Sequence, residues 1–474
     1  MNQRATIAGL ALAAAVSGAW GGPEDHAPPA VAPVLRDTFE VGAIGQRIES
    51  ASEGDVIRLE PGVYRERVRI GKRVTIDGGG RAVIDGGGTG DIVEITAAGA
   101  VLRGVTIRNT GTDLDRENAG LRVLAGGVTV EGVVLEDVLF GIDLREAPGC
   151  VVRGCRIGGK ALDIARRGDG LRLWRSDGAL IEGTTIHDGR DAILWYSKGV
   201  VIRGNRSDDC RYGFHLMFSD DVLIEGNTLT GNSVGAYLMY STGVVIRGNR
   251  FIRNRGPSGY GIGLKETDRF EVTDNLIVGN RSGVYIDGSP FTGAAPGVFT
   301  RNTIAYNDVG VTFLPSAKGN EMTLNNFIGN IEQVSVSGRG GLTANRFWVG
   351  EVGNFWSDYT GYDRDGDGVG DFVHESSTFF ENLMDRHPRL RLFMFSPAQQ
   401  AVEFVARAVP AVRPEPKFED EVPRMRPVAI GLVERAEGSS AWRMAGVSGL
   451  MLAGGVLVLA WSMGGAGRPR GGEA

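Results

Sequence analysis

The sequence predicts an all-β fold, a right-handed parallel β-helix of about a dozen coils, followed by a C-terminal helical tail and a membrane segment. The first support is a repeat: VIRGNR at 201–206 returns as LIEGNT at 223–228 and as VIRGNR at 245–250, a step of 22 residues each time. The second is the 73 glycines, which suit many tight turns and follow no Gly-X-Y period. An antiparallel sandwich also has short strands, but it gives no reason for one phrase to return in register.

Charges along the repeats support the same register. The residue before the turn glycine alternates in sign through Arg103, Glu131, Arg153, Glu182, Arg203, Glu225 and Arg247. Neighbours in a parallel ladder lie about 4.8 Å apart, so alternation removes the repulsion between like charges. Asn205, Asn227 and Asn249 follow the turn glycines, and we expect them to stack as a ladder.

The N-terminal stretch has the pattern of a secretory signal peptide. Arg4 precedes an apolar run at 5–16, and the small residues Ser17 and Ala19 suit cleavage after residue 19. The alternative is a core or membrane helix, for which the run is short. We therefore expect a signal peptide at 1–19, an N-terminal segment at 20–50, and a β-helix domain with an acidic closing loop at 51–395.

The C-terminal part is predicted to be helical and then membrane-spanning. Apolar residues at 401, 402, 405 and 409 share one helical face, so 396–440 reads as a helix and a Pro-rich linker. Residues 445–463 carry no charge and just suffice to cross a bilayer, and Arg468 and Arg470 favour a cytoplasmic tail at 464–474. The chain would then be exported and tethered on the outer side of a cytoplasmic membrane; a buried soluble helix is the alternative.

Charge and cysteine content favour neither a nucleic-acid partner nor a disulfide framework. The formal net charge of −6 gives no general support for a nucleic-acid partner. Cys150 and Cys155 would lie about 16 Å apart in an extended chain, beyond the roughly 7 Å that a disulfide permits. Together with Cys210 they are expected to be core residues.

Each repeat carries a second strand whose alternate residues face opposite sides. One set is uniformly apolar and is predicted to fill the interior: Leu144, Leu173, Leu194, Leu216, Leu238, Leu264, Ile286 and Phe313. The other set faces outward and includes Trp174, Trp195, Met217 and Met239, with His215 and Tyr237 beside them. An exposed apolar patch of this kind usually marks an interaction site.

Two copies of one phrase, GFHLMFSDD at 213–221 and GAYLMYSTG at 235–243, place the methionines at equivalent positions. Met217 and Met239 would lie about 4.8 Å apart on adjacent coils, with His215 about 7 Å away along the same face. Thioether sulfur combined with imidazole selects Cu(I), so these three are copper candidates. Two alternatives remain open: a partner-docking patch of Trp174, Trp195, Met217, Tyr237 and Met239, and packing beneath a loop.

An acidic loop, DRDGDGVGD, follows the repeats. Asp363, Asp365, Asp367 and Asp371 occupy positions 1, 3, 5 and 9 of a calcium-type loop, which makes them calcium candidates. Position 12 is His374 in place of the usual glutamate. The alternative is an acidic, glycine-rich turn that caps the solenoid.

No enzymatic constellation emerges from the sequence. Hydrolases of this fold need paired carboxylates and lyases need a basic proton acceptor, and we expect neither a suitable pair nor a His–Asp cluster shared between coils. The chain has no GxxxxGK[ST] stretch, so a partner would have to use any ATP. We therefore expect a non-catalytic protein.

At HLMFS, YLMYS and DRDGDGVGD, and over roughly residues 51–397, the chain resembles the NosD family of accessory proteins. The resemblance implies a periplasmic adaptor for nitrous oxide reductase maturation in denitrification, with copper(I) as transient cargo. It implies as partners an ABC transporter of ATPase and permease, a copper-donor lipoprotein and the apo nitrous oxide reductase. The repeats alone are shared with sugar-acting proteins, so a membrane-tethered carbohydrate-binding or polysaccharide-degrading β-helix is the alternative.

Overall fold

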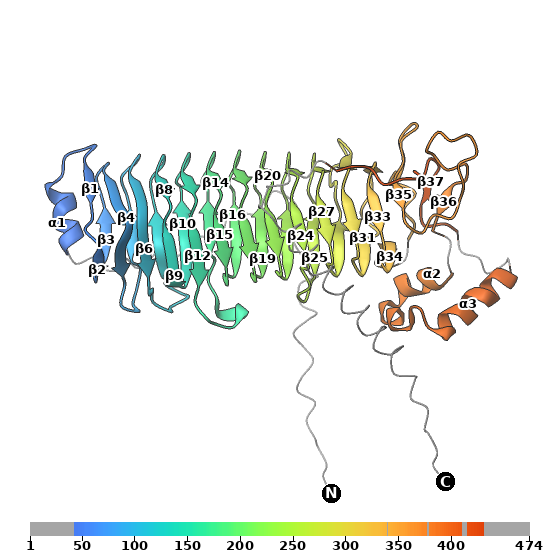
Figure 1. Cartoon of the computed structure of the whole chain (residues 1–474), viewed down its shortest axis with the longest axis horizontal. Helices are drawn as coiled ribbons and strands as arrows, with labels where there is room; N and C mark the ends of the chain where they lie inside the picture. Colours follow the sequence, from blue (N-terminus) through green and yellow to red (C-terminus); the bar gives the residue numbers. More distant parts are fainter. Residues whose placement is uncertain (1–41, 339, 377–378, 410–414, 431–474) are drawn as a thin grey trace, which may run out of the picture. The chain divides into compact units, whose positions relative to one another are not determined.

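The computed structural model describes residues 42–338, 340–376, 379–409 and 415–430. It confirms a parallel β-solenoid, in which strands from successive repeats stack side by side (Figure 1). One coil consists of three short strands, as in β17 (Val201–Arg203), β18 (Arg206–Asp208) and β19 (Tyr212–Met217). The third strand of each coil joins a 12-stranded sheet, which corresponds to the expected dozen coils.

The 12-stranded sheet is continuous and parallel throughout, and it carries the predicted copper and docking residues. Its strands, in stacking order, are β3 (Val68–Ile70), β5 (Val93–Ile95), β7 (Ala119–Val123), β10 (Phe140–Arg145), β13 (Leu171–Trp174), β16 (Asp191–Trp195), β19, β22 (Val234–Met239), β25 (Tyr260–Lys265), β28 (Ser282–Asp287), β31 (Val309–Phe313) and β34 (Glu332–Val336).

The remaining solenoid strands form a 23-stranded sheet that supplies the other two strands of each coil. They are β1 (Val56–Arg58), β2 (Gly62–Tyr64), β4 (Thr75–Asp85), β6 (Val101–Arg108), β8 (Thr129–Glu131), β9 (Val134–Val138), β11 (Val151–Arg153), β12 (Arg156–Gly159), β14 (Leu180–Glu182), β15 (Thr185–His187), β17, β18, β20 (Leu223–Glu225), β21 (Thr228–Thr230), β23 (Val245–Arg247), β24 (Arg250–Ile252), β26 (Glu271–Thr273), β27 (Leu276–Val278), β29 (Gly297–Thr300), β30 (Thr303–Ala305), β32 (Asn320–Thr323), β33 (Asn326–Ile328) and β35 (Phe355–Trp356).

The interior and the ladders follow the sequence predictions. Every member of the predicted interior column, from Leu144 to Phe313, is fully buried. Asn205 Nδ2 donates to Asn227 Oδ1 at 3.0 Å, and Asn227 Nδ2 donates to Asn249 Oδ1 at 2.9 Å. These bonds satisfy buried amides along the stack, which explains why the turn asparagine recurs.

The alternating charges and the cysteines also behave as expected. Glu225 accepts from Arg203 and Arg247 of the two adjacent coils, each at 3.0 Å. The three cysteines are free thiols buried in the core. Burial raises the pKa of Cys155 to about 11, so this thiol stays protonated and unreactive.

Helices close both ends of the solenoid. α1 (Ala43–Ser50) lies in the segment to which the sequence analysis assigned no element, and it buries Ile44 and Ile48 against the first coils. At the other end, the buried Lys417 ammonium lies 3.0 Å from Glu332 of β34 and 2.8 Å from Asp385 of α2 (Phe379–Arg386). Such caps cover the edge strands that a solenoid would otherwise expose.

The C-terminal region is partly helical. A 3₁₀ helix, η2 (Pro388–Phe393), and α3 (Pro397–Ala408) follow α2, which already begins within the stretch 51–395 expected for the β-helix domain. A second 3₁₀ helix, η1 (Ile164–Arg166), interrupts the coils, and β36 (His374–Glu375) pairs antiparallel with β37 (Glu419–Asp420).

No helix in the described part of the chain is long and apolar enough to cross a membrane. The expected signal peptide at 1–19 and the expected membrane segment at 445–463 both lie outside the described residues.

Candidate functional site

A row of large side chains crosses the outer face of the 12-stranded sheet. Trp174 of β13, Trp195 of β16, Met217 of β19 and Met239 of β22 are successive partners in the parallel register. All four are half-buried. The structure therefore brings the predicted copper and docking residues onto adjacent strands, in a surface that is less open than the sequence suggested.

The turns behind this row explain the repeated phrase. Ser197, Ser219 and Ser241 are buried and form a ladder, in which Ser197 N donates to Ser219 Oγ at 3.2 Å and Ser219 N donates to Ser241 Oγ at 3.1 Å. Each hydroxyl also donates to the carbonyl of the tryptophan or methionine two residues before it, at 3.0 to 3.2 Å. The ladder fixes the ends of β16, β19 and β22 relative to one another.

Three aromatic rings stack on the same turns. Tyr196, Phe218 and Tyr240 have φ angles of 51°, 52° and 54°, in the left-handed region that bulky residues seldom adopt. Their rings stack with centroids 5.1 Å and 5.0 Å apart. The sequence analysis missed this stack, although the aromatic residue before each serine in WYS, MFS and MYS was its signal.

The sulfur of Met217 has a hydrogen-bond donor. Trp195 Nε1 donates to Met217 Sδ at 3.0 Å, and Trp174 packs edge-on against Trp195 with centroids 5.4 Å apart. A thioether sulfur has two lone pairs, so this bond fixes the Met217 side chain and leaves one lone pair for another partner.

His215 lies beside this row and is buried, with 7% of its surface exposed. The rings of Tyr212 and Tyr237 cover it, with centroids 4.8 Å and 6.3 Å away. Its Nδ1 lies 3.4 Å from Asp191 Oδ2, and its Nε2 is buried without a hydrogen-bond partner among the described residues. The expectation that no His–Asp cluster joins adjacent coils was therefore wrong.

Asp191 is a candidate site residue that the sequence analysis missed. It is fully buried on β16, and it accepts from Arg211 Nε at 2.9 Å as well as facing His215. Burial alone would raise the pKa of the Asp191 carboxyl, but hydrogen bonds from His215 and Arg211 outweigh it and lower the pKa. Asp191 is thus a carboxylate that only accepts hydrogen bonds.

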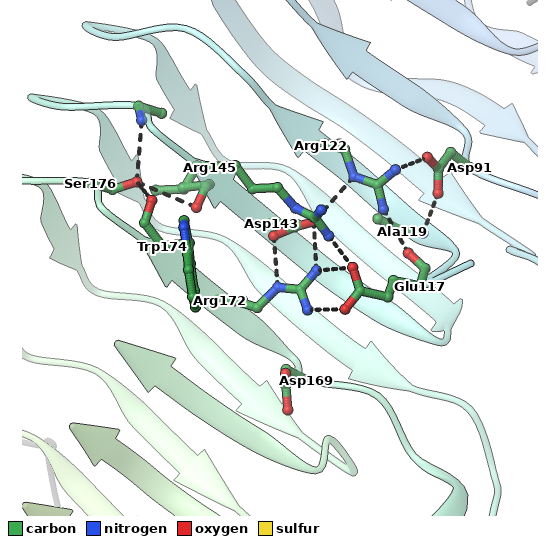
Figure 2. A network of polar contacts seen from close by, with 12 residues as sticks. Asp91, Glu117, Ala119, Arg122, Asp143, Arg145, Asp169, Arg172, Trp174 and Ser176 are labelled. Atoms are coloured by element: carbon green, nitrogen blue, oxygen red, sulfur yellow. Dashed lines mark hydrogen bonds and ion pairs between the residues drawn. The ribbon is translucent and has the colours of Figure 1, made fainter. Parts of the chain in front are cut away.

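A different set of side chains fills the same face two coils nearer the N-terminus. There Asp143 of β10 accepts from Arg122 at 3.1 Å, from Arg145 at 2.8 Å and from Arg172 at 2.8 Å (Figure 2). Glu117, on the loop before β7, receives two further bonds from Arg172 at 2.7 and 3.0 Å. Burial opposes ionisation of Asp143, but the three guanidinium groups hold its pKa well below its usual range.

Tyrosines continue the face beyond β22. Tyr260 stacks on Tyr285 with centroids 4.2 Å apart. Burial raises the pKa of Tyr237 and Tyr285 far above the ordinary value, so these phenols stay protonated at physiological pH. They are therefore unsuited to act as catalytic bases.

The acidic closing loop brings three of its four calcium candidates together. Ligand oxygens of Asp363, Asp365 and Asp367 lie within 4.8 Å of one another. Asp371 instead accepts from the backbone N–H of Arg364 at 2.8 Å. His374, at loop position 12, is buried and stacks on Trp356 with centroids 4.7 Å apart, so it serves the packing of the cap.

Comparison with known proteins relates the chain to a family. The family model described as periplasmic copper-binding protein (NosD) matches residues 153–361, which include His215, Met217 and Met239. A protein of Pseudomonas aeruginosa, named a probable ABC transporter binding protein NosD, is 32% identical over 364 residues, covering 74% of this chain and 82% of that protein. A protein of the same name from Stutzerimonas stutzeri is 34% identical over 146 residues, covering 29% of this chain and 32% of that protein.

Among solved structures, the A-module of the Azotobacter vinelandii mannuronan C-5 epimerase AlgE4 is similar, with a TM-score of 0.51. The match covers 62% of this chain and 90% of that chain at 14% sequence identity. At this identity the likeness shows a shared β-solenoid and carries no information about activity.

Proposed function

This chain belongs to the NosD family, and from that premise we propose that it is a non-catalytic, periplasmic copper-handling adaptor for the maturation of nitrous oxide reductase. Its cargo is Cu(I), held transiently by His215 Nε2 and by the sulfurs of Met217 and Met239. The observation that carries the proposal is the buried Nε2 without a partner, beside two thioethers on adjacent strands. A soft donor set of this kind favours Cu(I) over hard cations.

The proposed partner proteins are suggested by the names of the relatives and by the absence of a GxxxxGK[ST] stretch from the sequence. Relatives named ABC transporter binding proteins support an ATPase and a permease as partners, and the ATPase would use the ATP. A copper-donor lipoprotein would load the site, and the apo nitrous oxide reductase would receive the ion. Trp174, Trp195, Tyr237 and the two methionines would form the face on which donor and acceptor dock.

A second surface suits the membrane permease. Leu392 is 87% exposed, Phe395 74% and Phe404 74%, so η2 and α3 present an apolar face to solvent. Exposed patches of this kind mark protein or membrane contacts, and a permease offers an apolar counterpart. We propose that this end of the molecule docks on the permease, with the periplasmic body tethered to the inner membrane through residues 445–463.

Calcium binding at the closing loop stays a prediction. Asp363 accepts from the backbone N–H groups of Gly366 and Gly368, so its loop is already closed around the carboxylates. We propose that Asp363, Asp365, Asp367 and Asp371 hold one Ca²⁺ ion that stiffens the cap. A rise in melting temperature on adding Ca²⁺, absent in Asp365→Asn, would support it.

The competing function is a carbohydrate-active β-helix. Asp191 and His215 on the sheet face are the observation in its favour, because an acid–base pair is what such an enzyme needs. Against it, the carboxylate is fully buried, and the neighbouring phenols stay protonated. Turnover of alginate or pectate by the full-length protein would support the enzyme.

The deciding experiment is a Cu(I) titration of the full-length protein against a competing chelator. The triple variant His215→Ala, Met217→Ala, Met239→Ala should lose binding, whereas the control Met394→Ala, which removes a thioether from the C-terminal region, should bind as the unsubstituted protein does. If the triple variant binds Cu(I) as tightly as the unsubstituted protein, copper binds at other residues. No binding by any of the three proteins would leave the face as a docking patch through which copper does not pass.

A further inference from the structure

We propose that Asp191 is a positioning residue that fixes His215 in the tautomer carrying its proton on Nδ1, so that Nε2 presents its lone pair to Cu(I). This inference rests on the proposed function. Asp191 would act on the ion only through the imidazole of His215, and it is therefore not a ligand itself.

The geometry of β16 and β19 supports the assignment. Asp191 Oδ2 lies 3.4 Å from His215 Nδ1, and Asp191 is fully buried. An ionised carboxylate can only accept, so Nδ1 must carry the proton in this pair. The other ring nitrogen, Nε2, is then the acceptor, and no described residue donates to it.

Packing alone does not account for an imidazole here. Ile193 of β16 is the register partner of His215, and at 2% exposure it shows that an aliphatic side chain fills this column on the preceding coil. A buried nitrogen without a partner destabilises the fold relative to such a side chain. The imidazole is therefore explained by a ligand that Nε2 binds in some state of the protein.

A residue at each end of β16 orients one candidate copper ligand on β19. Asp191 holds the imidazole of His215, and Trp195 Nε1 donates to the sulfur of Met217 at 3.0 Å. Each of these two candidate donors is thus oriented by one hydrogen bond from the same neighbouring strand. Outer hydrogen bonds of this kind commonly hold metal-ligating histidines and set their basicity.

The test compares Asp191→Asn with Asp85→Asn in the full-length protein. Asp85 is the control, since it is also buried and accepts from one arginine, Arg108, at 2.8 Å, but lies on β4, several coils from His215 in the stacking order. In a Cu(I) competition titration, Asp191→Asn should weaken binding by about 10- to 100-fold, the usual effect of removing such a partner. Asp85→Asn should change the affinity by less than about twofold, because distant sites without shared partners act independently.

A second readout measures the tautomer of His215 directly and does not require copper. In the copper-free, unsubstituted protein labelled with ¹⁵N-histidine, the His215 resonances, assigned by their loss in His215→Ala, should report the Nδ1–H tautomer. In Asp191→Asn the tautomer should become mixed, because an amide can donate or accept.

Three outcomes separate this inference from the proposed function. Weakened Cu(I) binding in Asp191→Asn together with the Nδ1–H tautomer supports both. Unchanged affinity in Asp191→Asn, or an Nε2–H tautomer in the unsubstituted protein, overturns the positioning role while the copper site stands. Absence of Cu(I) binding by the unsubstituted protein overturns both.

Discussion

On the outer face of the 12-stranded sheet, β10 and β13 carry a closed ionic network, whereas β16 and β19, one and two strands further on, carry Asp191 and His215. The two regions occupy equivalent register positions, since Asp143, Arg172, Ile193 and His215 are successive partners. Both are buried from solvent. They differ in whether every buried polar atom has a hydrogen-bond partner.

In the network, Asp143 accepts from three arginines and Arg172 bonds two carboxylates (Figure 2). Such a set holds coils and a covering loop together and offers nothing further to a ligand. At His215, one nitrogen is held and the other has no partner among the described residues. Burial and charge are therefore common to the two regions, and the unpartnered Nε2 of His215 is what separates them.

The largest expected effect comes from breaking the network. Asp143→Ala leaves three arginines around one empty position, and removal of one partner of a buried ion pair costs about 3–5 kcal/mol. Urea denaturation followed by circular dichroism should show this loss in the free energy of unfolding. Cu(I) affinity should stay unchanged if the protein is measured while folded. A stability close to that of the unsubstituted protein would show that the network contributes little.

The network should also make stability depend on acid pH. Burial raises the pKa of Glu117, but bonds and charge from Arg172 and Arg145 outweigh it, so the folded-state pKa lies below the unfolded value. The stabilisation is then complete above the unfolded pKa of about 4.3 and is lost as the pH falls through the folded value. Below about pH 4.3, Glu117→Gln should lose stability less steeply, by up to about 1.4 kcal/mol per pH unit. Equal slopes in urea denaturations at several pH values would contradict this.

Substituting His215 in the other region should have the opposite result: little change in stability, and loss of Cu(I) binding. His215→Phe keeps a ring between Tyr212 and Tyr237 and removes a buried nitrogen without a partner, at the loss of one bond to Asp191. These contributions are of similar size, so the free energy of unfolding should change by less than about 1 kcal/mol. Cu(I) binding in the chelator competition should be lost. A large loss of stability with intact copper binding would reverse the assignment of the two regions.

The smallest effect is expected where the same ion-pair chemistry lies at the surface. Glu225 bonds Arg203 and Arg247 of the adjacent coils, but both arginines are about half exposed, with side-chain exposures of 48% and 50%. Glu225→Gln should cost about 0.2–1 kcal/mol, and less at high salt, because water and ions screen the pair. A cost approaching that of Asp143→Ala would mean that burial is not what separates the two networks.

The sequence by itself determined the features that depend only on the step from one coil to the next. The 22-residue repeat places Leu216 above Leu194 and Asn227 beside Asn205, because parallel strands pair equivalent residues. The same step aligned Met217 with Met239 and with Trp195. Local periodicity therefore predicted the interior column, the asparagine ladder and the row of candidate ligands.

Only the tertiary structure decided which side chains surround those candidates. The register shifts within β16, where Asp191 pairs with Tyr212 while Ile193 pairs with His215. Asp191 and Tyr212 are one residue closer in the sequence than the 22-residue repeat predicts. The shifted register turns the Asp191 carboxylate toward the His215 imidazole on the next coil. The loop that brings Glu117 over Arg172 is likewise outside the repeat. Contacts made by bulges and insertions have no period, so the sequence pattern could not reveal the partner of His215 or the closure of the network.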